Sequence, residues 1–142
     1  MSQVDPKHLG RVFDEAEFGP VSADEIVAYS RSLGETAPCY VEPGPELRGH
    51  PTYCVRFRSR KGFPDDFPTH LLGRMSFDAG KDIEFGTPIR PGDMVRVTSS
   101  VHEVYEKTGR TGTMTFVVVR FAMTNQRGDH LATIDNRMMF RP

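Results

Sequence analysis

The stretch from Ser22 to Pro43 reads SADEIVAYSRSLGETAPCYVEP and contains a helix start, a helix stop and a proline-rich segment. Ser22 is a preferred N-cap residue, and Glu25 three positions later has the spacing of a capping box. Gly34 suits the left-handed conformation that commonly ends a helix. The stretch therefore predicts a short amphipathic helix that ends at Gly34, with an apolar face formed by Ile26, Tyr29 and Leu33.

The segment after this helix is expected to be a rigid, non-repetitive loop from Glu35 to Tyr40. Pro38 and Pro43 disfavour a further helix because proline lacks the N–H that a helix interior needs and restricts the residue before it. A loop held in this way can position side chains for chemistry, or it can simply turn the chain.

Length and composition indicate one globular domain, 1–142, with residues 1–10 as a loose tail or a short helical turn. The formal net charge of −1 gives no general attraction to nucleic acid or to a membrane surface, and no apolar run reaches the length of a membrane span. Two cysteines do not form a disulfide framework, so a reducing cytoplasm is the expected location.

The second half of the chain has the pattern of long strands from Lys81 onward. Met94–Tyr105 places Val95, Val97 and Val101 on one face, whereas Met114–Met123 is apolar on both faces, as in a covered central strand. Turns are predicted at 91–93, 109–112 and 125–129, and the last strand is expected to bury Ala132, Ile134, Met138 and Phe140.

The first half is expected to add a short edge strand at Val12–Phe18 and an exposed turn at 44–49. Residues 50–57 have the β-branched and aromatic pattern of a strand, and 58–69 form a basic loop that closes over something or packs on a partner. A helical region followed by antiparallel strands is an α+β layout. The open sheet edge favours a dimer over a monomer.

The loop after the first helix resembles a motif of the MaoC-like hydratases and dehydratases. Residues 34–43 read GETAPCYVEP, where that family reads Gly-Asp-x-Asn-Pro-x-His-x-Asp-Pro, and the resemblance resumes at 72–85 and 87–93. It implies a hot-dog fold, which is a curved antiparallel sheet wrapped around a central helix. It also places a buried helix near residues 50–57, in place of the strand, with Pro51 in its first turn.

The same resemblance implies a reaction, the hydration of an enoyl thioester or its reverse, with acyl-CoA or an acyl-carrier thioester as substrate and no cofactor. The Asp and the His of the motif form the family's catalytic pair. By position, Glu35 replaces that Asp, Ala37 the Asn and Tyr40 the His. An unperturbed phenol, with a pKa of about 10, is a poorer proton shuttle at neutral pH than an imidazole.

The candidate site residues form three groups. Glu35, Tyr40 and His50 are the catalytic candidates, against the alternatives of a loop cap, a space-filling ring and a surface histidine. The substrate-binding candidates are Pro51, Thr52, Tyr53, Asp78, Ala79 and Gly80, of which the last three also suit a plain β-turn. The candidates for contact with the phosphates of coenzyme A, or with the pantetheine arm of an acyl carrier, are Arg56, Arg58, Arg60 and Lys61, which equally suit a solvated face.

The remaining titratable residues do not form a further predicted site. The other histidines lack carboxylate or cysteine partners at ligand spacing, so no metal site is expected. Cys39 and Cys54 are expected to be small buried hydrophobes, because no neighbouring histidine would activate a thiolate.

Four functions are compatible with these residues. The first is a hydratase or dehydratase subunit that shapes the acyl tunnel while a second hot-dog chain, in a homodimer or heterodimer, carries the Asp/His pair. The second is a self-sufficient hydratase that uses Glu35 with Tyr40, His50 or Asp78. The third is a non-catalytic acyl-thioester binding module, and a hot-dog thioesterase is the weakest.

Overall fold

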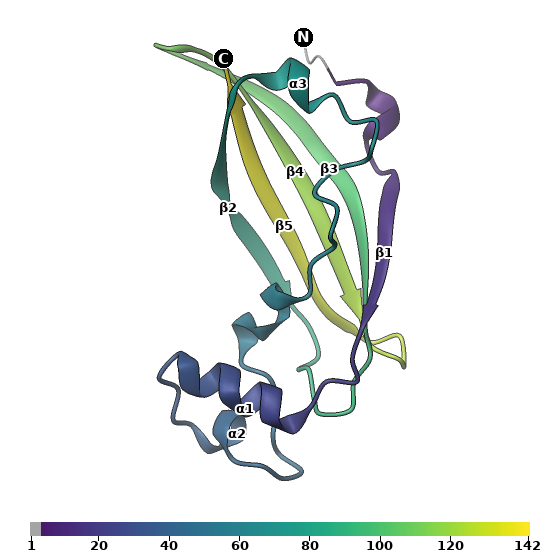
Figure 1. Cartoon of the computed structure of the whole chain (residues 1–142), viewed down its shortest axis with the longest axis vertical. Helices are drawn as coiled ribbons and strands as arrows, with labels where there is room; N and C mark the ends of the chain where they lie inside the picture. The colour runs from purple at the N-terminus through teal and green to yellow at the C-terminus, as the bar shows by residue number, and fades with distance from the viewer. Residues whose placement is uncertain (1–3) are drawn as a thin grey trace.

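The computed structural model describes residues 4–142 and contains one five-stranded antiparallel sheet (Figure 1). The strands lie in the order β1-β3-β4-β5-β2. Their bounds are β1 Val12–Phe18, β2 Met75–Phe85, β3 Val95–Gly109, β4 Gly112–Thr124 and β5 His130–Arg141. The predicted α+β class is confirmed, and β1 is an edge strand as expected, while β2 forms the other edge.

The middle strands confirm the predicted burial pattern. Val95, Val97 and Val101 of β3 are fully buried. The consecutive residues 117–119 of β4 are also buried, which requires cover on both faces of the sheet. A tight hairpin joins the two strands between Gly109 and Gly112, as the two glycines predicted.

β2 is longer than its sequence pattern predicted. It begins at Met75, which pairs with Arg141 at the far end of β5, and not at Lys81. Asp78–Gly80 is therefore part of the strand and not a turn. A break in register between Asp78 and Lys81 gives a β-bulge, and Gly80 adopts a φ of +101° there, which a residue with a Cβ rarely adopts.

α1 and α2 lie together at one end of the sheet (Figure 1). α1 spans Ala23–Ser32 and has the complete capping box predicted at Ser22 and Glu25. The expectation that prolines exclude a further helix was wrong, because α2 forms at Pro38–Val41 with Pro38 in its first turn, where no N–H is needed. In residues 4–142, no helix is long and apolar enough to cross a membrane.

Asp93 holds this helical end to the sheet. Its buried carboxylate accepts hydrogen bonds from the Arg90 backbone N–H at 2.9 Å and from Gln126 Nε2 at 3.0 Å, so it joins two turns. The backbone carbonyl of Asp93 accepts the N–H of Val21, one residue before the N-cap of α1, at 2.9 Å. The predicted turn at 91–93 therefore also fixes where α1 begins.

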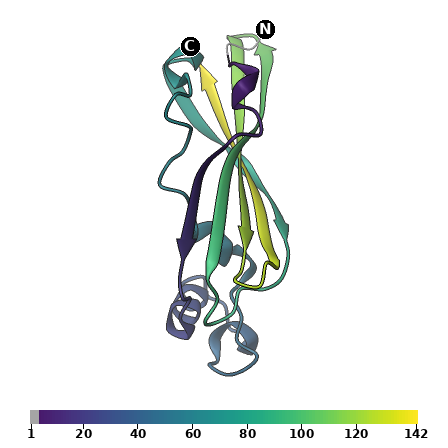
Figure 2. The same ribbon diagram turned by 90° about the vertical axis from the view of Figure 1, so that its right-hand side faces the viewer.

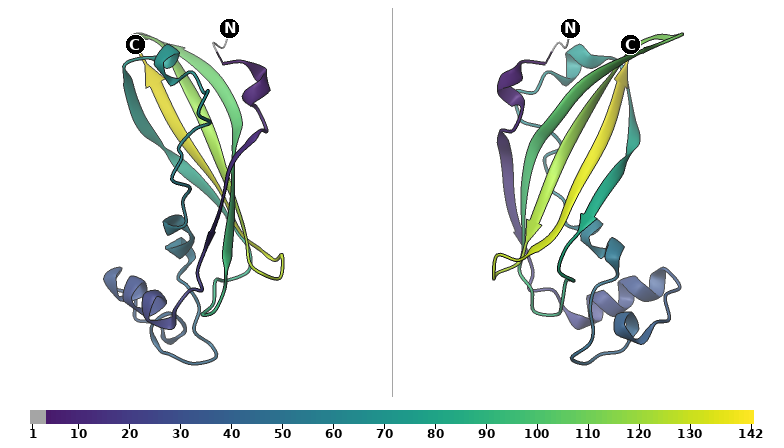
Figure 3. Two further views of the ribbon diagram at one scale, coloured as in Figure 1. Left: turned by 45° about the vertical axis from the view of Figure 1, so that its right-hand side comes forward. Right: turned by 180° about the vertical axis from the view of Figure 1, so that it is seen from behind.

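The chain then crosses one face of the sheet from the helical end to the opposite end (Figures 1, 2 and 3). It begins with η2, a 3-10 helix at Pro51–Arg56, which confirms a helix rather than a strand with Pro51 in its first turn. The central helix is only these six residues. Residues 57–68 continue as irregular chain to α3, Thr69–Leu72, and Phe57, Phe63 and Phe67 pack onto the core, so this basic loop packs on its own sheet.

The N-terminal turn lies at the end of the sheet opposite α1 and α2 (Figure 1). η1 spans Pro6–His8, which confirms the helical alternative for part of the predicted tail, and residues 1–3 lie outside the described residues. The predicted exposed turn at 44–49 is exposed only in its first half, because Leu47 and Gly49 are buried. The apolar side chain of Leu47 comes directly after the exposed residues 44–46 and packs into the core.

Candidate functional site

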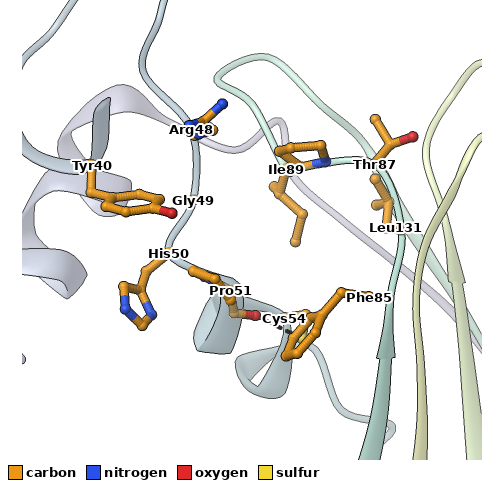
Figure 4. A pocket seen from close by; sticks show the side chains of 12 residues that line it. Tyr40, Arg48, Gly49, His50, Pro51, Cys54, Phe85, Thr87, Ile89 and Leu131 are labelled. Carbon is orange, nitrogen blue, oxygen red and sulfur yellow. Dashed lines mark hydrogen bonds between the residues drawn. The ribbon is translucent and has the colours of Figure 1, made fainter. Parts of the chain in front are cut away.

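An apolar pocket of about 340 Å³ lies between the helical segments at one end of the sheet and the end of β2 (Figure 4). One wall comes from α2, the turn after it and η2, and consists of Tyr40, Arg48, Gly49, His50, Pro51 and Cys54. The opposite wall comes from the end of β2, the following turn and β5, and consists of Phe85, Gly86, Thr87, Pro88, Ile89 and Leu131. The volume falls within the range of small-molecule sites.

Glu35 lies beside this pocket but does not line it. Its Oε1 accepts the backbone N–H groups of Thr36 and Ala37, each at 3.0 Å. These two hydrogen bonds, that of Ala37 first, and the nearby His50 lower the pKa of the Glu35 carboxyl. The carboxylate is thus held as a stable anion that orders its own loop.

His50 lines the pocket with its ring between three partners. Its Nε2 lies 3.6 Å from Oε2 of Glu35. Its Nδ1 accepts the backbone N–H of Thr52 at 3.3 Å and lies 3.0 Å from the Thr52 hydroxyl. Because a backbone N–H can only donate, Nδ1 is the unprotonated nitrogen, and the ring proton is on Nε2 facing Glu35.

Tyr40 packs on this group from the α2 side. Its ring centroid lies 5.3 Å from that of His50, and the guanidinium carbon of Arg48 lies 5.8 Å from the Tyr40 ring centroid. A further hydroxyl extends the network away from the pocket, since Tyr29 Oη lies 2.9 Å from the Thr52 hydroxyl. The structure therefore brings together all three catalytic candidates, Glu35, Tyr40 and His50.

The predicted substrate-binding residues of η2 have different surroundings. Pro51 lines the pocket, whereas the hydroxyl of Thr52 already contacts His50 Nδ1 and Tyr29 Oη. Tyr53 is only 1% exposed and packs edge-on against Tyr29 and Phe57. Burial raises the pKa of its phenol. Tyr53 is thus a core residue.

The other predicted substrate-binding residues, Asp78–Gly80, lie away from this pocket, within β2. The Asp78 carboxylate accepts the Gly80 N–H at 2.9 Å and pairs with Lys81 at 3.1 Å. These contacts, the Gly80 hydrogen bond first, lower the pKa of Asp78. The carboxylate stabilises the β-bulge of its own strand.

The basic run is divided between two places. The Arg56 guanidinium lies over the Tyr53 ring at 5.1 Å, near the start of α1. Arg58, Arg60 and Lys61 instead line a cavity of about 270 Å³ between the crossing segment and β4 and β5, and Lys61 pairs with Asp65 at 3.0 Å. The four side chains do not form one phosphate site.

The two cysteines have different surroundings. Cys54 is buried and its thiol donates to the carbonyl of Pro51, and burial raises its pKa, which disfavours the thiolate. Cys39 is half-buried and free. The prediction of a small buried hydrophobic residue is confirmed for Cys54, whereas Cys39 is only half-buried.

Several residues of the pocket were not predicted from the sequence, namely Arg48, Phe85, Ile89 and Leu131. Leu131 reaches the pocket through the pairing of β5 with the end of β2, and Ile89 lies after β2, where its carbonyl accepts the Gly49 N–H. Local sequence specifies neither contact. Arg48 had no local signal, because it lies in the stretch 44–49 that the sequence predicts to be an exposed turn.

Comparison with known proteins agrees with this architecture. The family model for the FAS1-like dehydratase domain region matches residues 7–134. Among solved structures, the MaoC-like dehydratase from Rhodospirillum rubrum is 22% identical with a TM-score of 0.66, covering 94% of each chain. No curated protein is significantly similar in sequence.

Two further similar structures come from complexes of Mycobacterium tuberculosis. A chain of the ChsH1-ChsH2 complex is 18% identical, with a TM-score of 0.70, over 92% of this chain and 85% of that one. A chain of the C-terminally truncated HadBC (3R-hydroxyacyl-ACP dehydratase) complex is 16% identical, with a TM-score of 0.66, over 93% and 96%. The hot-dog fold is thereby confirmed. Because the family model spans most of the chain, the protein belongs to the FAS1-like dehydratase domain family, with the fold of the MaoC-like hydratases and dehydratases.

Proposed function

We propose that this chain is a subunit of an (R)-specific enoyl-thioester hydratase or 3-hydroxyacyl-thioester dehydratase. It forms part of the acyl pocket, and a second hot-dog chain supplies the Asp/His pair. One observation carries the proposal: both ring nitrogens of His50, the one histidine that lines the pocket of residues 4–142, face protein partners and not the pocket space.

Hydration of an enoyl thioester requires a base for water, a proton donor for the α-carbon and N–H groups for the thioester oxygen. The backbone N–H groups of Gly49, Gly86 and Thr87 in the pocket walls already donate to the carbonyls of Ile89, Leu131 and His130. Such N–H groups have no second proton for an oxyanion. This supports a binding role for the pocket and catalysis by another chain.

The state of Glu35 supports the same division of work. A general base is most effective when its pKa lies near the working pH, whereas the pKa of Glu35 is lowered by its loop hydrogen bonds. Tyr40 occupies the position of the family's histidine and has its ring against His50. The family membership and the two similar complexes, ChsH1-ChsH2 and HadBC, support a hot-dog partner.

The test is reconstitution. The purified chain is assayed for hydration of crotonyl-CoA alone and after mixing with a second hot-dog chain from the same source that carries the intact Asp and His motif. We expect turnover only from the mixture. Changing the partner's motif Asp to Asn should abolish it, whereas robust hydration by the isolated chain would contradict the proposal. Tight thioester binding without turnover in any pairing would instead indicate a binding module.

A second candidate, hydration by this chain alone, is favoured by the 3.6 Å contact between His50 Nε2 and Glu35 Oε2 beside the pocket. It requires the ring to turn away from Thr52 so that one nitrogen meets the substrate. Under this alternative, Glu35→Gln lowers turnover of the isolated chain by about a hundredfold or more.

A further inference from the structure

Arg48 is the one permanently charged side chain among the residues that line the apolar pocket between Tyr40 and Ile89 (Figure 4). The remaining surface is mainly carbon, contributed by Pro51, Phe85, Ile89 and Leu131. A half-buried guanidinium in such surroundings loses hydration, and this loss is costly unless an anion or another polar group replaces the water.

No carboxylate in residues 4–142 lies within salt-bridge distance of Arg48. By contrast, Arg120 forms a bidentate ion pair with Asp135, with hydrogen bonds of 2.7 and 2.8 Å, and Arg11 pairs with Asp66. Arg48 instead lies over the Tyr40 ring, which attracts a cation weakly. A side-chain hydrogen bond and charge interaction with Cys39, and weaker interactions with Tyr40, raise the pKa of Arg48, so the cation persists at every physiological pH.

This arrangement leaves the planar N–H groups of a guanidinium at the wall of an apolar slot, which is a geometry that suits a carboxylate or phosphate. The rest of the pocket decides between these two anions. A pantetheine arm would bring two amide groups, and the wall N–H groups of Gly49, Gly86 and Thr87 are already used. A hydrocarbon chain that ends in a carboxylate needs only the apolar walls and Arg48.

Resting on the proposed function, we infer that the pocket takes an acyl group that carries its own free carboxylate. Arg48 pairs with that carboxylate while Phe85, Ile89 and Leu131 contact the hydrocarbon part. Arg48 is therefore a specificity-determining residue, which favours thioesters of dicarboxylic acids over those of simple fatty acids of the same length.

The first test is direct binding to the isolated full chain by calorimetric titration with three probes: hexanoate, hexan-1-ol and 4′-phosphopantetheine. We expect hexanoate to bind at least about tenfold more tightly than hexan-1-ol, because the alcohol lacks the negative charge and the second acceptor oxygen of a carboxylate. Arg48→Met keeps an unbranched chain over Tyr40 and should remove this preference, whereas Arg48→Lys should keep part of it. Arg110→Met, at the exposed tip of the β3–β4 hairpin, is the matched control.

Equal binding of hexanoate and hexan-1-ol, or an unchanged preference in a folded Arg48→Met chain, would overturn the inference. Tighter binding of 4′-phosphopantetheine than of hexanoate, lost in Arg48→Met, would also overturn it and assign Arg48 to the thioester arm. Thermal unfolding of each variant separates loss of the ligand contact from loss of the fold.

The second test uses the reconstituted pair of chains with crotonyl-CoA and glutaconyl-CoA, which differ by a terminal carboxylate. We expect a higher kcat/KM for glutaconyl-CoA, reversed by Arg48→Met. Turnover of both substrates with no preference would overturn the inference and leave the proposed function in place. Hexanoate binding that depends on Arg48, with no turnover in any pairing, would leave the site in place and reject the proposed function.

Discussion

Two histidine–carboxylate contacts lie at opposite ends of the sheet, and they differ in burial and in what surrounds the ring. His8 in η1 is 2% exposed, and its Nδ1 lies 4.0 Å from Oδ1 of Asp66. That nitrogen has no hydrogen-bond partner within residues 4–142, and the ring packs edge-on against Phe67 at 5.3 Å. His50 is partly exposed beside the apolar pocket, and its Nδ1 is hydrogen-bonded.

The carboxylates in the two contacts share one property, which is that stronger donors than the imidazole already hold them. Arg11 pairs with Asp66 and lowers its pKa to about 2, and two backbone N–H groups hold Glu35. The comparison teaches that nearness of an imidazole and a carboxylate does not by itself define a catalytic pair. A ring nitrogen free to meet substrate is also needed.

The largest expected difference is in stability. His8→Ala should lower the free energy of unfolding by about 2–3 kcal/mol, because it leaves a cavity beside Phe67 in a buried site. His50→Ala removes an N-cap contact of η2 and should cost about 1 kcal/mol. Urea unfolding of both variants measures this, and a larger loss for His50→Ala would break the comparison.

The stability of the wild-type chain should depend more strongly on acid pH than the stability of Asp66→Asn. The Asp66 pKa is about 2 in the fold against an ordinary value of 3.8, chiefly because of the Arg11 hydrogen bond. A lowered folded pKa adds stability above the ordinary value and loses it as the pH falls toward 2. The unfolding temperature of the wild type should therefore fall more steeply between pH 4 and pH 2 than that of Asp66→Asn, and parallel curves would contradict this.

Glu35 has the same sign of pKa shift and a smaller expected effect. Its lowered pKa means that protonation below its usual range weakens the loop hydrogen bonds from Thr36 and Ala37. In the reconstituted complex, Glu35→Gln should change turnover by less than about threefold, far below the ~100-fold loss that follows removal of a general base. Steady-state kinetics with crotonyl-CoA provide the measurement, and Glu42→Gln is a matched exposed control.

The smallest effect is spectroscopic. In ¹⁵N-labelled protein, His50 should be the tautomer with its proton on Nε2, because the Thr52 N–H donates to Nδ1. Thr52→Val removes the hydroxyl contact but keeps this N–H, so the tautomer should persist with a cost of about 1 kcal/mol. A proton found on Nδ1 would free Nε2 as a base and favour the self-sufficient hydratase.

Local patterns predicted α1, the hairpin of β3 and β4, and burial on both faces of β4 because each depends on neighbours in sequence. They failed for the start of β2, whose first residues pair only with the far end of β5. They also failed for α2, because a single helical turn that begins with Pro38 has no periodicity to detect.

For the candidate site, the sequence by itself determined the residues of the loop, Glu35 and Tyr40 among them, and the capped helix that precedes it. Only the tertiary structure decided that both nitrogens of His50 face protein groups and that Arg48 faces an apolar pocket without a carboxylate partner. The physical reason is that capping and turn preferences act within a few residues. Whether a charged group is paired depends on which distant segments the sheet brings beside it.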